Sequence, residues 1–278
     1  MKNQKKHPLL SIIIPTFNSA GTITETLESI VNQIYTNIEV IVVDGFSNDT
    51  TCELVNKFKA AYSHSTITLV SEKDKGVYDA MNKGIKLAKG DFLYFMGSDD
   101  VFYNKDTLNQ IFSKENLKYD FIYGNVEFKK SKRIHSGKSS LDRLIIDQIS
   151  ICHQAIFYSK ETFKKVGNYN LKYFIHADYD FNIRCFREKE IKIKYLNIIV
   201  AIFNETGLSG LKSNADGFHL ELTEFNIAQK YNIVDLYYEK LSLEKKLKIL
   251  SNSKEFRLGS FLLKPFRRIK KYFKILSK

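Results

Sequence analysis

The sequence DFLYFMGSDD, residues 91–100, decides the fold, because an apolar run stops abruptly at two adjacent acidic side chains. Two earlier stretches share this design: SIIIPTFN at residues 11–18 and IEVIVVDG at residues 38–45. Short β-branched runs that end at polar residues are typical of buried parallel strands. The strands predicted in this way cover residues 11–14, 38–43, 67–70 and 91–96.

Amphipathic helices are predicted between these strands. Residues 22–34 and 77–88 repeat apolar side chains at helical spacing, and Asp49 or Thr50 can cap a third helix that runs through Phe58. Alternating strands and helices with short connections predict an α/β fold with a mostly parallel sheet covered on both faces. Beyond residue 101 the pattern is less regular. The elements predicted there are edge strands at 121–128 and 154–158, a helix at 179–187, a strand region at 191–203 and a helix at 217–231.

Polar clusters follow three of the predicted strands. They are Thr16–Asn18, Asp44 and Ser98–Asp100. In open parallel sheets ligands bind in the crevice beyond the carboxyl ends of the strands. We therefore expect these clusters to meet in one cleft that holds the functional site.

Composition limits the class of protein. With 278 residues, 44% of them hydrophobic, the chain can bury one sizeable core. Its first 18 residues superficially resemble a secretory signal, but Pro15 ends the apolar run, so we interpret it as a buried strand. No apolar run approaches the ~18 residues of a spanning helix. The cysteines, Cys52, Cys152 and Cys185, are odd in number and far apart, which favours thiols in a reducing compartment. We expect a cytoplasmic protein.

The net charge of +12 is concentrated near the C-terminus. Residues 244–278 contain 12 Lys or Arg and only 2 Glu, so the preceding 243 residues are nearly neutral. A nucleic-acid-binding protein would carry basic residues across its body. The distribution therefore predicts a surface-docking tail and no nucleic-acid partner.

Three clusters have the chemistry of a ligand site, and each has a plainer alternative. Asp99 and Asp100 repel each other unless a cation such as Mg²⁺ or Mn²⁺ lies nearby; alternatively they form a solvated turn. Asp44 can accept an amide or imide hydrogen of a nucleobase, or cap a turn. In DKGVYDAMNKG, residues 74–84, a helix would gather Asp79 and Asn82 on one side, toward a ligand or toward solvent.

Taken in order, these stretches resemble the family 2 glycosyltransferases, in particular the branch that builds capsule, colanic-acid-type and O-antigen polysaccharides. The resemblance covers roughly residues 9–210. It implies a GT-A fold, a Rossmann-like nucleotide-binding sheet, with residues 9–105 as the nucleotide-sugar half and 106–215 as the acceptor half. Residues 1–215 would then form the catalytic domain, and 216–278 a C-terminal helical region. The implied cofactor is Mn²⁺ or Mg²⁺.

The resemblance also assigns roles to residues. The nucleotide-sugar site would comprise Pro15, Thr16, Asn18, Asp44, Asp74, Lys75, Gly76, Asp79, Asn82 and Asp99. Asp44 would contact the base and Asp100 would hold the metal. Gly97 stands where the family often has Asn, which leaves the sugar-side contacts open.

The acceptor half would supply the catalytic base. In FIHADYDFNIRCF, residues 174–186, Asp178 matches the aspartate of the family's Glu-Asp pair, and Ala177 replaces the Glu. One carboxylate must take the proton from the attacking hydroxyl in an inverting transfer. Asp180 is the rival base, and Asp178 can also cap the following helix. His153 and Gln154 resemble an acceptor-side position, although a lone His is as often structural.

Two further segments resemble functional elements. Residues 207–209 match a loop that closes over the donor, or form an ordinary turn. Residues 260–278 combine apolar side chains at steps of three and four with a basic opposite side. A basic amphipathic helix predicts docking on an anionic membrane, here the inner face of the cytoplasmic membrane. The alternatives are packing on the enzyme's own body or on a second subunit, so a homo-oligomer stays open.

Together these features predict a metal-dependent hexosyltransferase, inverting by resemblance. It would move a sugar from a nucleoside-diphosphate sugar, UDP before GDP or dTDP, to a hydroxyl of a saccharide or lipid-linked acceptor in bacterial surface polysaccharide synthesis. A dinucleotide-dependent oxidoreductase would need G-x-G-x-x-G after the first strand, where residues 15–21 read PTFNSAG. A catalytically inactive, membrane-associated glycosyltransferase-like binding partner is the remaining alternative.

Overall fold

The computed structural model describes residues 7–204, 215–230 and 242–247. The chain divides into two units, Met1–Glu221 and Leu222–Lys278. The predicted loop at 207–209 and the basic tail at 260–278 lie outside the described residues, and the domain boundary after residue 215 stays a prediction. None of the described helices is both long and apolar enough to cross a membrane.

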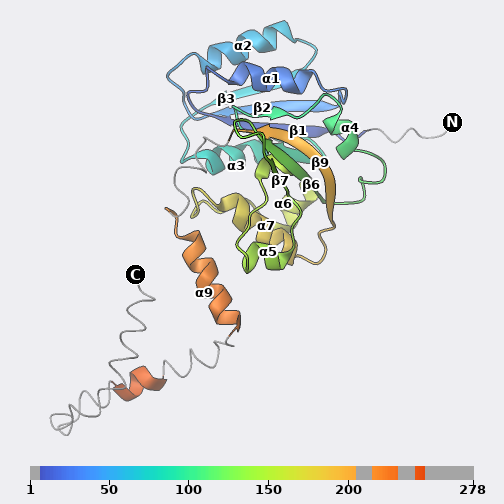
Figure 1. Cartoon of the computed structure of the whole chain (residues 1–278). Helices are drawn as coiled ribbons and strands as arrows, with labels where there is room; N and C mark the ends of the chain where they lie inside the picture. The colour runs from blue at the N-terminus through green and yellow to red at the C-terminus, as the bar shows by residue number, and fades with distance from the viewer. Residues whose placement is uncertain (1–6, 205–214, 231–241, 248–278) are drawn as a thin grey trace. The chain divides into compact units, whose positions relative to one another are not determined.

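The described strands form one sheet (Figure 1). Its order is β3-β2-β1-β4-β8-β6-β9-β5, and β7 pairs with β6. The strands are β1 (Leu10–Thr16), β2 (Ile38–Asp44), β3 (Thr66–Ser71), β4 (Phe92–Phe95), β5 (Val101–Phe102), β6 (Phe121–Phe128), β7 (Ile134–His135), β8 (Ile156–Ser159) and β9 (Ile193–Phe203).

The first half of the sheet is parallel. β1 pairs in parallel with β2 and β4, and β2 pairs in parallel with β3. The register sets Thr16 beside Asp44, and Asp44 beside Ser71, at the last position of each strand. The predicted α/β fold is confirmed, and three strand ends lie in one row.

The second half is mixed. The strands predicted at 121–128 and 154–158 are present as β6 and β8, but their predicted place at the edge of the sheet is wrong. β8 runs antiparallel to both β4 and β6, while β6 runs parallel to β9. Both β6 and β8, predicted as edge strands, therefore lie inside the sheet. The reason is visible in their burial: residues 121–126 and 156–159 are buried at every position, so both faces of these strands are covered.

Helices cover both faces of the parallel half. They are α1 (Ile23–Val31), α2 (Thr51–Ala61) and α3 (Val77–Leu87). Later in the chain come α4 (Thr107–Ile111), α5 (Leu141–Ile145), α6 (Lys160–Val166), α7 (Ala177–Arg187) and α9 (Phe218–Lys230), with a 3₁₀ turn at His153–Ala155. In Figure 1, α1 and α2 lie on one side of β1–β3 and α3 on the other. Ile12 and Val42 pack with Leu27 of α1 and Val55 of α2 in one core.

The next residue of β1 faces α3. A Cβ atom added to Gly84 would lie 2.3 Å from Cγ2 of Ile13. Because successive residues of a strand point to opposite faces, Ile12 and Ile13 serve the two helical layers in turn. Gly84 lets α3 approach the sheet closely, which fixes where the start of α3 lies relative to the strand ends.

Candidate active site

Asp44 occupies the centre of the row of strand ends. Its side chain is fully buried, and it accepts hydrogen bonds from Oγ of Ser71 at 2.7 Å, from N of Ser47 at 2.9 Å and from Oγ1 of Thr16 at 3.2 Å. Oγ of Ser47 and Sγ of Cys52 also donate to it. Burial raises the pKa of Asp44, but the hydrogen bonds from Ser47, Ser71 and Cys52 outweigh burial and lower it.

The loops after β1 and β2 are joined by hydrogen bonds. Asn18 donates its backbone N–H to Ser47, and its side-chain oxygen accepts from N of Asn48 at 3.0 Å. Its φ of 51° is in the left-handed region, which Asn tolerates better than most residues. Asp49, expected as a helix cap, accepts from N of Thr51 at 2.9 Å. Asn18 therefore serves to hold the two loops together.

The register of the sheet explains why a proline is tolerated at position 15. The pairing of β1 with β4 ends at Ile13, which accepts from N of Met96. Backbone groups of alternate residues point to the same neighbouring strand, so position 15 faces the β4 side beyond that last bond. A residue without an N–H is accommodated there.

Asp99 and Asp100 follow β4. Asp100 is 1% exposed and accepts from Nε2 of Gln154 at 2.6 Å and from N of Asn204 at 2.8 Å. Asp99 accepts from Nδ2 of Asn204 at 2.8 Å. Burial, followed by the charge of Asp99, raises the pKa of Asp100 to about 6. A Cβ at Gly97 would lie 2.4 Å from Oδ2 of Asp100, so this position leaves room for the carboxylate.

The segment before α3 approaches the end of β2. A Cβ at Gly45 would lie 2.6 Å from Oδ2 of Asp74, so that Asp74 lies directly against the residue after Asp44. Its Oδ1 accepts from N of Gly76, whose φ is 117°. In the next turn, Oδ2 of Asp79 accepts from N of Lys75 at 3.0 Å. The carboxylates of this segment thus shape the loop by binding its backbone.

Asn82 departs from the expected ligand-facing geometry. It is buried, and its amide group makes two hydrogen bonds with the backbone of Tyr169, donating at 3.0 Å and accepting at 3.1 Å. Helical periodicity assigned Asn82 to a polar side with Asp79. In the structure this amide docks α3 on the segment before α7, and a role of Asn82 at the nucleotide sugar stays a prediction.

Asp178 lies in the first turn of α7, between two side chains from distant segments. Oδ1 lies 2.7 Å from the hydroxyl of Tyr78, and Oδ2 lies 3.5 Å from Nδ1 of His153. N of Tyr179 also donates to Oδ1, at 2.9 Å. Burial raises the pKa of Asp178, but the hydrogen bond and charge of His153 and the hydrogen bond from Tyr78 outweigh it and lower the pKa.

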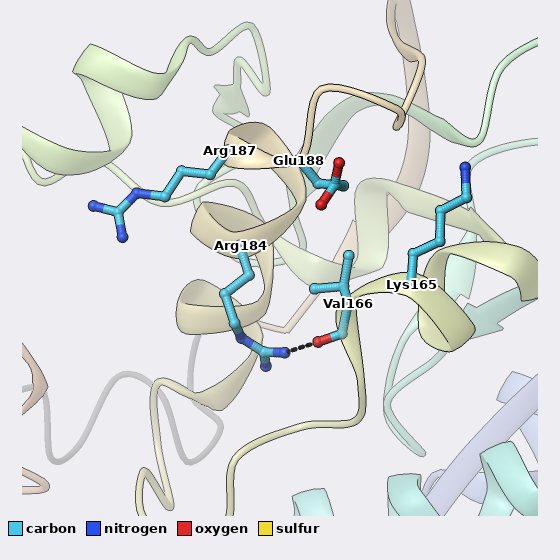
Figure 2. Close-up of a pocket in the computed structure, with 5 residues that line it drawn as sticks. All are labelled: Lys165, Val166, Arg184, Arg187 and Glu188. Carbon is cyan, nitrogen blue, oxygen red and sulfur yellow. Dashed lines mark hydrogen bonds between the residues drawn. The ribbon is translucent and has the colours of Figure 1, made fainter.

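The rival base faces a different partner. Oδ2 of Asp180 lies 2.9 Å from Nε of Arg184, four residues later on the same helix. Arg184 also donates to the carbonyl of Val166, at the end of α6 (Figure 2). A further bond runs from Arg184 to the carbonyl of Asn168. With these bonds Arg184 closes a small depression of about 270 Å³ that Lys165, Arg187 and Glu188 also line. Asp180 thus belongs to an ion pair away from Asp178.

Two consecutive residues connect the candidate carboxylates. His153 contacts Asp178, and Gln154 donates to Asp100. Both belong to the 3₁₀ turn before β8, and the carbonyl of Gln154 accepts from the hydroxyl of Tyr94 at 2.7 Å. The turn therefore brings together side chains that lie 78 positions apart in the sequence.

Sequence reasoning missed three kinds of neighbour. Ser71 was detectable, because it ends its strand as Asp44 does. Tyr78 and Asn204 were not detectable, since they contact Asp178 and Asp99, which lie 100 and 105 positions away in the sequence. Two exposed aromatic residues also lie in the loops that flank Asp44, Phe17 at 63% and Phe46 at 59% exposure. In the described part of the chain, no group of three or more His, Cys, Asp or Glu side chains could hold a metal alone.

The fold is that of the GT-A class of proteins. Two solved structures share the fold: S. aureus TarS with UDP-GlcNAc, at TM-score 0.58 and 22% identity over 70% of this chain and 58% of that one, and the Pyrobaculum calidifontis mannosyltransferase PcManGT with GDP-Man and Mn²⁺, at TM-score 0.57 and 21% identity over 72% and 57%. The chain thus spans less than two thirds of each of these structures.

Sequence comparison gives the family. The model of glycosyl transferase family 2 matches residues 11–188, and the chain belongs to this family. It is 42% identical over 202 residues to a PGL/p-HBAD biosynthesis glycosyltransferase of Mycobacterium tuberculosis, covering 72% of this chain and 78% of the relative. It is 38% identical over 122 residues to the Escherichia coli UDP-Glc:alpha-D-GlcNAc-diphosphoundecaprenol beta-1,3-glucosyltransferase WfaP, covering 44% and 47%. The predicted family and transferase class are confirmed.

Proposed function

We propose that this transferase is metal-dependent and inverting, and that it moves a sugar from a UDP-sugar to a hydroxyl of a saccharide or lipid-linked acceptor in bacterial surface polysaccharide synthesis. The observation that carries the proposal is the pair of contacts from adjacent residues, His153 to Asp178 and Gln154 to Asp100. These contacts support one site in which Asp178 would accept the proton and Asp100 would lie on the diphosphate side.

In the proposed reaction Asp178 is the base. The acceptor hydroxyl gives its proton to the carboxylate while its oxygen forms a bond to the anomeric carbon. The bond from that carbon to the diphosphate oxygen breaks, and its electron pair leaves with the nucleoside diphosphate. The lowered pKa of Asp178 keeps the side chain ionised at neutral pH, the form that accepts a proton, and makes it a weaker base than a carboxylate whose pKa lies near the working pH.

Asp99 and Asp100 have suitable chemistry for Mn²⁺ or Mg²⁺. Their oxygens are hard ligands, and ionisation of Asp100 is disfavoured by burial and by Asp99, which a cation would relieve. The lack of a third acidic or imidazole ligand among the described residues fits a metal held largely by substrate phosphates. Such an ion would neutralise charge on the departing diphosphate.

The loops beside Asp44 would hold the nucleoside. Two of the donors to this carboxylate come from Ser47 in a partly exposed loop. We propose that the imide N–H of uracil replaces a donor from Ser47. Phe17 and Phe46 add exposed π-faces on which a base can stack. The name of WfaP, which specifies UDP-Glc, supports UDP as the first nucleotide to test.

Thermal stability against UDP, GDP, dTDP and CDP, each with and without Mn²⁺, tests the proposal. A ligand at about 100 times its dissociation constant stabilises by ~2.7 kcal/mol, which is visible as a melting shift. We expect a shift with UDP that requires the metal and is lost in Asp100→Ala. A protein that responds to none of the nucleotides would instead be the inactive glycosyltransferase-like partner.

The basic tail at residues 260–278 would dock the enzyme on an anionic inner membrane surface, where a lipid-linked acceptor is presented. Deletion of this segment should abolish sedimentation with phosphatidylglycerol liposomes and leave the melting temperature unchanged. Neutral phosphatidylcholine liposomes are the control. Equal binding by the full and shortened chains would exclude the tail as the membrane anchor.

A further inference from the structure

We propose that Tyr78 of α3 positions Asp178 so that one particular carboxylate oxygen receives the acceptor proton. The proposal rests on the proposed function of Asp178 as the base. Tyr78 belongs to the helix that follows the Asp74–Gly76 loop, whereas Asp178 belongs to α7. The two side chains meet although they are 100 positions apart in sequence.

The two oxygens of Asp178 have different surroundings. Oδ1 accepts from the hydroxyl of Tyr78 at 2.7 Å and from N of Tyr179 at 2.9 Å. The contact of Oδ2 is with Nδ1 of His153 at 3.5 Å, which is longer than a typical hydrogen bond. Oδ1 is therefore committed to the protein, and Oδ2 is the oxygen with capacity to accept a proton.

The hydroxyl of Tyr78 also lies 2.6 Å from the carbonyl oxygen of Ile175. A phenolic hydroxyl has a single proton, so it can satisfy only one of these acceptors fully at a time. An ionised carboxylate is the stronger acceptor, and the proton therefore goes to Asp178. With Oδ1 held by Tyr78, the carboxylate cannot rotate freely, and the direction of Oδ2 is fixed.

The docking of α3 on the rest of the protein does not require the hydroxyl of Tyr78. One turn later on α3, Asn82 already binds the backbone of Tyr169 with two hydrogen bonds. The ring of Tyr78 packs against that of Tyr169, with centroids 5.4 Å apart, and this packing needs no oxygen. A phenylalanine would keep the ring contact and remove only the bond to the carboxylate.

Loss of the hydroxyl should raise the pKa of Asp178. Hydrogen bonding to the charged form lowers the pKa of a carboxyl group, so removal of such a donor moves it upward. The titratable groups around Asp178 are Tyr78, Cys152, His153, Tyr158, Tyr169 and Tyr179. Of these side chains, Tyr78 and His153 are the ones in contact with the carboxylate.

The test is a ¹³C NMR titration of protein labelled at the aspartate carboxyl carbons. Asp178→Asn assigns the resonance, and Tyr78→Phe is the test variant. Tyr35→Phe is the matched control, because Tyr35 is also buried and its hydroxyl donates to a backbone carbonyl, that of Pro8, remote from Asp178. We expect the Asp178 resonance to titrate at higher pH in Tyr78→Phe and to be unchanged in Tyr35→Phe.

A kinetic measurement completes the test. Tyr78→Phe should lower kcat about tenfold, the effect of one charge-assisted hydrogen bond, with KM for the donor unchanged. An unaltered Asp178 titration in folded Tyr78→Phe would overturn the positioning role, whatever the activity. If the wild-type protein transfers no sugar from any donor, the proposed function fails, and the titration still decides whether Tyr78 controls the carboxylate.

Discussion

Asp44 and Asp100 both come after an apolar run in the sequence, yet their environments shift the pKa of the carboxyl group in opposite directions. Each comes at or just after the carboxyl end of a parallel strand, with 0% and 1% of the residue exposed. Asp44 accepts from Thr16, Ser47, Ser71 and Cys52, and its pKa is lowered. Asp100 accepts from Gln154 and Asn204 beside a second carboxylate, and its pKa is raised to about 6.

The difference separates two uses of a buried charge. The Asp44 charge is compensated by the protein, so it stabilises the fold of the loops around it. The Asp100 charge is under-compensated, which costs stability and is typical of carboxylates at functional sites. Burial and strand position alone do not distinguish the two. The number of donors and the sign of the nearest charge do.

Asp178→Asn extends the comparison to a third carboxylate and carries the largest expected effect. Its charge is compensated like that of Asp44, but one of its oxygens stays available. Loss of a positioned base should reduce transfer by about 10²–10⁴-fold, with affinity for UDP retained. Release of nucleoside diphosphate in the presence of acceptor, and calorimetric titration with UDP, measure the two quantities.

Asp180→Asn is the control for this prediction, since Asp180 pairs with Arg184. We expect it to keep most of the turnover. Retained turnover in Asp178→Asn together with a large loss in Asp180→Asn would assign the base to Asp180.

Asp44→Ala should be the most destabilising of these substitutions. It removes the acceptor of the buried Thr16 hydroxyl and of the partly exposed Ser47 N–H and Ser71 hydroxyl. Hydrogen bonds to a charged group contribute about 1.5–3 kcal/mol each, so we expect a loss of about 4 kcal/mol in the free energy of unfolding. Urea denaturation measures it. A loss below about 1 kcal/mol would mean that the carboxylate is dispensable to the loops.

Much of this comparison was accessible from sequence. The parallel strands and the helices between them are local patterns of burial, and their predicted positions agree with β1–β4 and α1–α3 within a few residues. Thr16, Asp44 and Ser71 then lie in one row, because the strands are parallel and their register pairs Thr16 with Asp44 and Asp44 with Ser71. The family resemblance added the assignment of roles, which the residues alone left open.

The remainder depends on contacts between distant segments. Periodicity identified Asn82 as polar but not its bonds with the Tyr169 backbone, which bury it. It also could not predict that Tyr78, on the same helix, reaches Asp178. For the same reason β6 and β8 were misplaced at edges, since β8 lies between two strands from earlier in the chain, β4 and β6, and β6 lies between two later ones, β8 and β9. Donor counts, and hence pKa directions, follow only from the folded structure.

Asp100→Asn should stabilise the protein, whereas Asp44→Ala destabilises it. Its effect should be the smallest of the three substitutions. A carboxyl whose pKa rises from 3.8 unfolded to about 6 folded binds protons more tightly in the native state. The wild-type protein therefore loses stability as the pH rises from about 4 to 6, by at most ~3 kcal/mol, and the deficit persists above that range.

The substitution removes this titration. In metal-free buffer, Asp100→Asn should be up to ~3 kcal/mol more stable than the wild type at pH 7 and nearly equal to it at pH 4, as urea denaturation at the two pH values would measure. Asp99→Asn is the matched variant, because it removes the like charge and keeps the Asp100 carboxyl; it should recover part of the same gain. A variant that is less stable than the wild type at pH 7 would show that Gln154 and Asn204 compensate the charge after all, and Asp100 would then resemble Asp44.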